Sequence, residues 1–553
     1  MTPTDEKKSG RVCLIGAGPG DPGLITARGL DLLRRADVVV HDALVLPSLL
    51  REARADAEVI DVGKRRSDHK LSQDQINALL VEKARQGLLV ARLKGGDPFI
   101  FGRGAEEAGH LAARGIACEI VPGVTAGIAA PAAAGIPLTH RLVASTVTFI
   151  TGHEDESKAD PVVDYAALAK LIAARGTLVI YMGIVRLETI AAKLLNAGVA
   201  STTPAAVIQW GATPRQRSGV TTLDRLPALV AKKHLWAPAV IVIGEVVGEG
   251  AIGEAGKHLD FYTQRPLFGQ RIVITRTREQ ASELRVKLEE LGAEVLEAPT
   301  IRIAQPSPEE SAKIDAALMR LANFHWLVLT SANGVQTLAS RLDALKLDAR
   351  SLAGVRIAAI GDATADALKK HVGVRAALVP RTFVAESLAE DLIASENARG
   401  GIAGKRFLLL RADIARKALP QLLTKAGASV EEFAIYLTAP VASLPHAVLD
   451  ALREGKVDWV TFTSSSTARN LVALLDRNAD NAPQSAEVAP QRPAMAIAGR
   501  SALTCAKLAS IGPITTQTLR DLGLPPTVEA TVSNIDGLIA AMVAHRPGGG
   551  VVR

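Results

Sequence analysis

The residues of this sequence best suited to bind a ligand lie in one stretch, residues 93–104. Two consecutive glycines, Gly95 and Gly96, follow an apolar run of buried-strand length at residues 88–91. Because glycine has no Cβ, a ligand can approach the backbone closely where a parallel strand ends. Asp97 adds a hydrogen-bond acceptor and a negative charge. The stretch therefore predicts a ligand-binding loop rather than a plain turn.

Other strand-like runs within residues 10–143 also end in loops rich in glycine, proline or charge. These loops are residues 16–23, 41–42, 64–66 and 122–126, and residues 135–141 form a further loop after a helix-like run of small residues. Helix-like segments alternate with the strands, at residues 26–35, 72–86 and 105–114. This alternation is typical of a parallel sheet, whose strands all end at the edge where open α/β folds bind ligands. We therefore expect the loops to form one site.

A Gly-x-Gly pattern, Gly16 to Gly18, follows the first of these strands. A dinucleotide-binding loop would also need a third glycine at the start of the helix and an acidic residue after the second strand. Pro19 and Pro22 interrupt the loop, so a pyrophosphate could not rest on the helix N-terminus in the usual way. A dinucleotide-dependent oxidoreductase stays as the alternative class for this half.

Composition places the chain among ordinary globular proteins, with 48% hydrophobic and 22% charged residues. Its 553 residues are enough for about three or four domains. Aromatic residues make up only 3%, which argues against a platform for stacking nucleic-acid bases. The formal net charge is +7 without a block of lysine and arginine. An anionic small molecule is therefore a better-suited partner than nucleic acid.

The cysteines and the apolar runs indicate the compartment. Cys13, Cys118 and Cys505 lie far apart without a Cys-x-x-Cys pair, so we expect a reducing environment and no metal site. Residues 1–10 lack the apolar core of a signal peptide. The longest apolar runs, such as residues 239–243, are far shorter than a membrane span. These features predict a soluble, cytoplasmic protein that contacts no membrane.

The rest of the chain divides into further α/β segments. Residues 145–250 contain strand-like runs that predict a second subdomain, and the irregular residues 251–267 are interpreted as a linker. Residues 268–543 repeat themselves loosely. The paired segments are 271–276 with 406–411, 324–331 with 457–464, and 359–364 with 510–515. The repeat predicts two similar α/β lobes, with serine- and threonine-rich strand ends facing a cleft between them.

Residues 10–250 resemble the uroporphyrinogen-III C-methyltransferases of the tetrapyrrole methylase family. The matching motifs are residues 16–23, 62–65, 93–104, 122–126 and 135–141. The resemblance implies a two-domain methylase fold, with subdomains at about residues 10–143 and 145–250, and S-adenosylmethionine as methyl donor. It implies two methyl transfers to uroporphyrinogen III, at C2 and C7, which give precorrin-2. It also implies a homodimer formed through this half.

The resemblance assigns individual residues as well. The family's cofactor contacts fall on Pro19, Gly95, Gly96, Asp97, Ile100, Thr125, Ala126, Met182 and Gly211. Its proposed base and acid fall on Asp42 and Lys64, each at the end of a predicted strand. Because the substrate is a polycarboxylate, we expect cationic side chains around it, namely Arg65, Arg103, His140 and Arg141. The alternative roles are a turn cap for Asp42 and surface charges for the cations.

Residues 268–543 resemble uroporphyrinogen-III synthase through residues 274–276, 329–334, 436–438 and 511–515. The resemblance implies a two-lobed α/β fold and ring closure of hydroxymethylbilane to uroporphyrinogen III. Tyr436 matches the tyrosine suspected of helping the hydroxyl leave. The expected cleft residues are Ser331, Thr364, Ser464 and Thr515. A strand-end cap is the alternative role of each of these hydroxyls.

The two halves would then catalyse successive steps, which favours one bifunctional enzyme. The alternative is an oxidoreductase in the first half joined to a two-lobed binding module without catalysis. The resemblance leaves open whether precorrin-2 goes to siroheme, cobalamin or heme d₁, and whether the intermediate passes directly between the halves.

Overall fold

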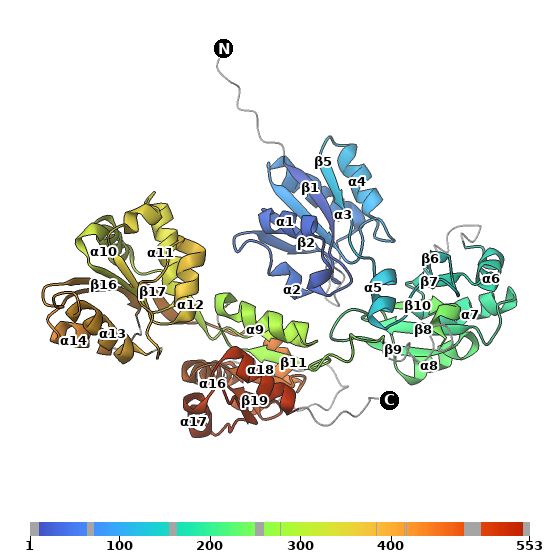
Figure 1. The fold of residues 1–553 in the computed structure, drawn as a ribbon. Helices are drawn as coiled ribbons and strands as arrows, with labels where there is room; N and C mark the ends of the chain where they lie inside the picture. Colours follow the sequence, from blue (N-terminus) through green and yellow to red (C-terminus); the bar gives the residue numbers. More distant parts are fainter. Residues whose placement is uncertain are drawn as a thin grey trace, which may run out of the picture. The chain divides into compact units, whose positions relative to one another are not determined.

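The structure is a computed structural model of the whole chain (Figure 1). It describes residues 10–63, 71–153, 163–248, 259–276, 278–382, 384–413, 415, 417–480 and 499–545, apart from the side chains of residues 278–282 and 478–480. The described residues form two compact units, residues 10–271 with 286–295, and residues 272–285 with 296–545. Four five-stranded sheets flanked by helices make up the fold. The predicted α/β class is confirmed.

The first sheet is fully parallel, with the strand order β3-β2-β4-β1-β5. Its strands are β1 (Arg11–Gly16), β2 (Val38–His41), β3 (Glu58–Asp61), β4 (Leu89–Lys94) and β5 (Ala117–Val121). The helices of this subdomain are α1 (Ala27–Arg35), α2 (Pro47–Leu50), α3 (Gln73–Arg85) and α4 (Gly104–Ala112). Alternate residues of β1 enter two different hydrophobic clusters, because both faces of the sheet are covered. Because every pairing in the sheet is parallel, the carboxyl ends of all five strands lie at one edge.

Strand β4 is longer than the sequence pattern predicts. The apolar run ends at Ala91, yet the strand continues through Arg92 and Lys94, and both of these side chains are buried. The pattern misses this continuation because charged residues are rarely buried without a partner. The partner is Glu107 on α4, which lies too far along the chain to be paired with β4 by local pattern.

The second sheet has the order β6-β7-β10-β8-β9, in which only β6 and β7 pair in parallel. Its strands are β6 (Val147–Thr151), β7 (Thr177–Tyr181), β8 (Pro204–Gln209), β9 (Arg217–Thr222) and β10 (Ala239–Ile243). The helices are α5 (Ala126–Ala133), α6 (Tyr165–Ala173), α7 (Leu187–Asn196) and α8 (Leu226–Lys232). Helix α5 follows β5 of the first sheet, and its Ala130 lies in one hydrophobic cluster with Val179 and Val242 of the second sheet. It therefore couples the two subdomains.

The described part of the predicted linker packs against the first unit. Tyr262 is only 4% exposed and lies in a hydrophobic cluster with Ala129 and Ala133 of α5 and with Ala212. A buried aromatic ring contributes substantially to stability. Residues 259–270 are therefore part of the packed structure, whereas residues 249–258 lie outside the described residues.

Two further sheets have the orders β12-β11-β18-β19-β20 and β13-β17-β16-β14-β15. The strands are β11 (Arg271–Ile274), β12 (Glu294–Glu297), β13 (Ile301–Ala304), β14 (Trp326–Leu329), β15 (Arg356–Ala359), β16 (Arg406–Ala412), β17 (Ser429–Pro440), β18 (Trp459–Phe462), β19 (Lys507–Ser510) and β20 (Val528–Glu529). The helices are α9 (Arg278–Glu290), α10 (Pro308–Met319), α11 (Ala332–Ala344), α12 (Asp362–Ala367), α13 (Ala385–Asn397), α14 (Ala418–Lys425), α15 (His446–Arg453), α16 (Ser465–Asp480), α17 (Pro513–Asp521) and α18 (Ile535–Ala544).

The two sheets repeat one arrangement, as the paired sequence segments predict. The run β12-β11-β18-β19 in one sheet corresponds to β17-β16-β14-β15 in the other. Two of the predicted segment pairs fall on β11 and β16 and on β18 and β14, and the third begins at the last residues of β15 and β19 and continues into α12 and α17. Among the residues that the structure describes, no helix combines the length and apolar character that a membrane span requires.

Candidate active sites

The loops after β1, β4 and β5 contact one another at the carboxyl edge of the first sheet. Gly18 and Gly96 exchange backbone hydrogen bonds of 3.2 and 2.7 Å. A Cβ on Gly16 would lie 2.5 Å from the backbone of Gly123, which is closer than real atoms approach. Glycine at these positions therefore lets three loops meet, as the sequence pattern predicts for a ligand-binding edge.

Both carboxylate oxygens of Asp97 accept backbone hydrogen bonds. Oδ1 accepts from the N–H of Phe99 at 2.8 Å, within its own loop. Oδ2 accepts from the N–H of Gly123 at 3.0 Å, in the loop after β5. A carboxylate has about four acceptor positions, so these two bonds still leave room for a ligand. Asp97 thus holds two loops of the candidate site together, whatever else it contacts.

The start of α5 is joined to the second sheet through Tyr181, the last residue of β7. Its hydroxyl lies 2.7 Å from Oγ1 of Thr125 and accepts from the N–H of Gly127 at 2.8 Å. Burial raises the pKa of Tyr181 above its ordinary value, so the phenol stays neutral. Sequence analysis missed Tyr181, although it directly precedes the predicted contact Met182.

Apolar side chains are exposed around these loops. Met182 is 50% exposed and Ile100 39%, and the flanking Phe99 and Phe101 are exposed as well. Met182, Phe101 and Trp210 have φ angles of 54°, 52° and 49°, a left-handed conformation that is unfavourable for side chains with a Cβ and recurs at functional sites. The exposed apolar surface is a suitable contact for an aromatic or apolar part of a ligand.

The remaining predicted cofactor contacts lie where the loops of the two subdomains meet. A Cβ on Gly211 would lie 2.2 Å from Cβ of Ala130, so close packing of α5 already requires glycine there. Ala126 is the first residue of α5. Pro19 is half-buried and precedes Gly20, whose added Cβ would meet Thr213 at 2.4 Å. Close packing between α5 and these loops therefore explains part of the need for glycine at the predicted cofactor contacts.

The predicted base and substrate contacts are only partly described. Asp42 follows β2, is 33% exposed, and accepts a 2.6 Å hydrogen bond from Nη2 of the buried Arg92. Lys64 and Arg65 lie outside the described residues. Asp42 therefore lies at the carboxyl edge of the sheet, and one of its oxygens accepts a hydrogen bond from the guanidinium of Arg92.

The other predicted cations lie on two different loops of the methylase half. Arg103 precedes α4 and forms a solvent-exposed ion pair of 2.7 Å with Glu106. His140 is half-buried and Arg141 exposed, both in the loop after α5. A substrate carboxylate would have to compete with Glu106 for Arg103, and an exposed pair of this kind is weak enough to allow it.

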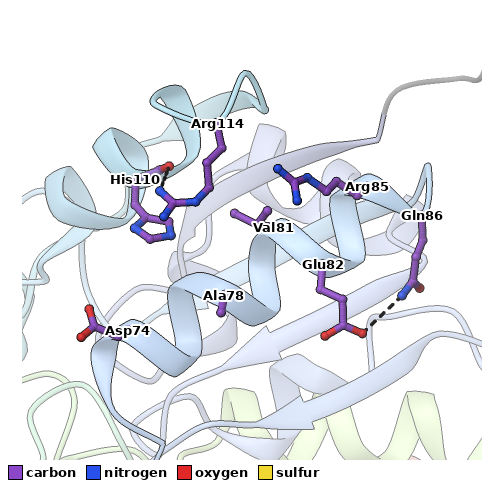
Figure 2. Close-up of a pocket in the computed structure, with 8 residues that line it drawn as sticks. All are labelled: Asp74, Ala78, Val81, Glu82, Arg85, Gln86, His110 and Arg114. Atoms are coloured by element: carbon purple, nitrogen blue, oxygen red, sulfur yellow. Dashed lines mark hydrogen bonds between the residues drawn. The ribbon is translucent and has the colours of Figure 1, made fainter.

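A surface hollow of about 810 Å³ lies elsewhere on the first subdomain. Figure 2 shows it between α3 and α4, with Glu82 and Arg85 on α3, His110 on α4, and Arg114 in the turn after α4. None of the predicted site residues lines it. It is a trough between two exposed helices and does not mark the candidate site.

In the second unit, Tyr436 contacts Ser331. The two hydroxyls lie 3.0 Å apart, and Oγ of Ser331 also accepts from the N–H of Gly334 at the start of α11. Tyr436 is 6% exposed, and burial raises the pKa of its phenol. Tyr436 and Ser331 therefore lie side by side, and Ser331 has the cap role that was its alternative.

The other predicted cleft residues lie at comparable strand ends. Thr364 is in the first turn of α12, in the same lobe as Tyr436. Ser464 and Thr515 follow β18 and β19 of the other lobe, where Ser464 accepts from the N–H of Thr467. Sequence analysis gave Arg276 no role, yet its Nε donates to Oγ1 of Thr463 at 3.0 Å beside Ser464.

Comparison with known proteins agrees with this division of the chain. The family described as Tetrapyrrole (Corrin/Porphyrin) Methylases matches residues 11–227. The family described as Uroporphyrinogen-III synthase HemD matches residues 282–540. The porphyrin biosynthesis protein HemD of Ruminiclostridium josui is 37% identical over 84% of this chain and 89% of its own length. The chain belongs to both families, and it joins a methylase domain and a synthase domain of tetrapyrrole biosynthesis in one polypeptide.

Other relatives match a smaller share of the chain. The uroporphyrinogen-III C-methyltransferase of Bacillus subtilis is 40% identical over 62% of this chain and 68% of its own length. The solved structure of uroporphyrin-III C-methyltransferase from Thermus thermophilus with S-adenosyl homocysteine is 38% identical, with a TM-score of 0.36, over 43% of this chain and 98% of that chain. The chain also spans about half the length of curated siroheme synthases, for example 51% of that of Pseudomonas putida.

Proposed function

We propose that the chain cyclises hydroxymethylbilane to uroporphyrinogen III and then methylates this product at C2 and C7 to give precorrin-2. The observation that carries the proposal is the union of both domain families in one chain, with a relative that spans both halves. The two reactions are successive, so the product of one half is the substrate of the other. The proposed domains are residues 10–250 and 268–543.

The methyl donor proposed is S-adenosylmethionine, which supplies an electrophilic methyl group when bound. The residues of the loops after β4 and β7 fit such a ligand. Gly95 and Gly96 offer backbone without side chains, Gly96 with a φ of 72° that favours glycine, while Ile100 and Met182 offer exposed apolar surface. These features suit a ligand with a flat apolar end and a polar tail.

Further residues of this edge would orient the same ligand. Asp97 retains acceptor positions beyond its two backbone bonds, and Thr125 lies at the start of α5. Pro19, Ala126 and Gly211 are the remaining proposed contacts of the methyl donor. Since methyl transfer depends on alignment of donor and acceptor, loops that fix one another are a suitable support.

Asp42 is the proposed base. After methyl transfer the pyrrole ring must lose a proton, and the carboxylate at the end of β2 would accept it. Arg92 holds one oxygen of Asp42, which leaves the other oxygen for that role. Lys64 is proposed as the accompanying acid. Arg65, Arg103, His140 and Arg141 are proposed to contact the carboxylate arms of the substrate, since guanidinium groups pair well with carboxylates and an imidazole N–H can donate to them.

For ring closure, the protein's task is to hold a reactive conformation of the linear tetrapyrrole. Tyr436 and Ser331 form one hydroxyl pair that we propose helps the hydroxyl of hydroxymethylbilane to leave. Thr364, Ser464 and Thr515 are proposed to hold the substrate, since hydroxyls and backbone amides can bind carboxylates. We also propose that the enzyme is a cytoplasmic homodimer formed through its methylase half.

Ligand affinities and partial reactions test this proposal against the oxidoreductase alternative. Calorimetry should show binding of S-adenosylmethionine, and NAD should bind far more weakly. Purified chain should methylate uroporphyrinogen III in a time-dependent manner. Tight NAD binding without affinity for S-adenosylmethionine would contradict the proposal and support the oxidoreductase.

A further inference from the structure

A cluster of charged side chains is buried beneath the candidate methylation site. Glu107 of α4 is 0% exposed, and Arg92 and Lys94 of β4 are 2% and 3% exposed. Charged residues are rarely buried to this degree unless they are paired. Together with Asp42, the cluster contains two cations and two carboxylates, so its charges balance.

The cluster forms a continuous path from Glu107 to Asp42. Oε1 of Glu107 accepts from Nη2 of Arg92 at 3.2 Å and from Nζ of Lys94 at 3.0 Å. The same Nη2 of Arg92 donates to Oδ1 of Asp42 at 2.6 Å. Gln73 of α3 donates to Oε1 of Glu107 at 3.1 Å. Glu107 is thus held by groups from two elements, while Arg92 connects it to the edge of the sheet.

The electrostatic setting keeps Glu107 charged. Burial opposes its ionisation, but Arg92 and Lys94 together hold the pKa of Glu107 below its ordinary value. Burial and the neighbouring Arg92 lower the pKa of Lys94. A buried ion network of this kind is seldom the most stable solution, because apolar residues of similar volume often stabilise a fold as well or better. Its position directly under Asp42 offers a functional reason for it.

We propose that Glu107 is a positioning residue for methyl transfer, acting through Arg92 on the orientation of Asp42. The inference rests on the proposed function in one respect, that Asp42 takes the proton from the methylated ring. Glu107 fixes the guanidinium of Arg92, and Arg92 fixes one oxygen of Asp42 so that the other faces the carboxyl edge. Without the charge of Glu107, the guanidinium keeps only its bond from Nη1 to the carbonyl of Leu93 on the protein side, so its orientation and that of the Asp42 carboxylate are less well fixed.

The test uses the full chain with uroporphyrinogen III and S-adenosylmethionine. Glu107→Gln keeps the shape of the side chain and removes its charge. We expect kcat for methyl transfer to fall roughly 10- to 100-fold, because misplacing a catalytic group by about 1 Å can cost that much. KM for both ligands should stay within about twofold, because neither contacts Glu107. Glu82→Gln, on the exposed face of α3 in Figure 2, is the matched control and should change neither constant.

A double-mutant cycle separates positioning from a purely structural role. In an Asp42→Asn background, Glu107→Gln should cause no further loss of kcat, because the effect of Glu107 passes through Asp42. If the two losses instead multiply, or if Glu107→Gln leaves kcat unchanged, the inference is overturned. Should Glu107→Gln fail to fold, Arg92→Lys, which keeps the charge but cannot bridge two carboxylates, is put through the same cycle and must show the same non-additivity.

The same measurements distinguish failure of this inference from failure of the proposed function. Asp42→Asn alone should reduce kcat by roughly 10²- to 10⁴-fold if it removes a general base. A variant Asp42→Asn with wild-type kcat would overturn both the proposed base and the role of Glu107. If Asp42→Asn lowers kcat as expected but Glu107→Gln leaves kcat unchanged, only the positioning role of Glu107 is overturned.

Discussion

The hydroxyl of Tyr181 lies 2.7 Å from Oγ1 of Thr125 and accepts a hydrogen bond from the N–H of Gly127. The last residue of β7 therefore caps the start of α5. This relationship joins the two subdomains of the methylase half at the proposed donor site. The sequence offered no cue for it, because Tyr181 and Thr125 lie on different elements and far apart along the chain.

Tyr181→Phe should destabilise the methylase half by about 1–3 kcal/mol, since it leaves a backbone N–H and a hydroxyl without their partner. We also expect weaker binding of S-adenosylmethionine, because Thr125 and Ala126 lose a fixed position. Chemical denaturation and calorimetry measure the two effects. Thr125→Ala in the same background should add little, since the bond is already broken; full additivity would show that the two hydroxyls do not cooperate.

Asp97→Ala should abolish methylation and leave ring closure intact. The change removes the backbone hydrogen bond that ties the β4 loop to Gly123 and the one from Phe99 within the loop, and it removes the proposed ligand contact. Asp97→Asn keeps one acceptor oxygen and should retain part of the activity. Calorimetry with S-adenosylmethionine, beside an assay of ring closure, is the measurement. Wild-type affinity in Asp97→Ala would contradict the role assigned to this carboxylate.

Separating the chain near residues 249–270 should give two independently folded proteins, each with its own activity. The structure adds that the methylase fragment needs residues 259–270, because Tyr262 packs on Ala129 and Ala133. A fragment ending at residue 248 should be less stable than one ending at residue 270 by about 2 kcal/mol, the typical contribution of one buried large side chain. Thermal unfolding of both fragments compares them. Equal stability, or failure of both to fold, would refute this boundary.

Ring closure should depend less on any single side chain than methyl transfer does. Tyr436→Phe should reduce the rate only moderately, because Ser331 remains beside the substrate and the enzyme's task is conformational. Replacement of Thr364 and Thr515 together should cost more than either alone. The ratio of uroporphyrinogen III to the uninverted isomer I, measured beside the rate, reports conformational control. Complete loss of turnover in a well-folded Tyr436→Phe variant would mean that a single acid carries the step.

Much of the architecture could be predicted from the sequence because it rests on local pattern. Alternating strands and helices predict the parallel first sheet, and the paired segments predict the repeated lobes. Glycines such as Gly16 and Gly96 predict where loops meet, since only a residue without Cβ permits such contact. The position of Asp42 at the carboxyl edge follows from the same parallel arrangement.

What the sequence could not reveal depends on partners distant along the chain. Arg92 and Lys94 look like the exposed end of a strand until Glu107 is placed beside them. The sequence pattern does not predict strand β9, because most of its residues are polar and it pairs only with β8, at the edge of the second sheet. The antiparallel pairing of β7, β8 and β10 was also missed, since apolar runs look alike in either direction.

The most direct test of the central claim supplies the full chain with hydroxymethylbilane and S-adenosylmethionine and identifies the products by mass and isomer analysis over time. The account predicts uroporphyrinogen III first, followed by a singly and then a doubly methylated product that matches precorrin-2. Omitting S-adenosylmethionine should stop the sequence at uroporphyrinogen III. Formation of isomer I alone, at the rate seen without protein, and without methylated product, would contradict the claim that this chain catalyses both steps.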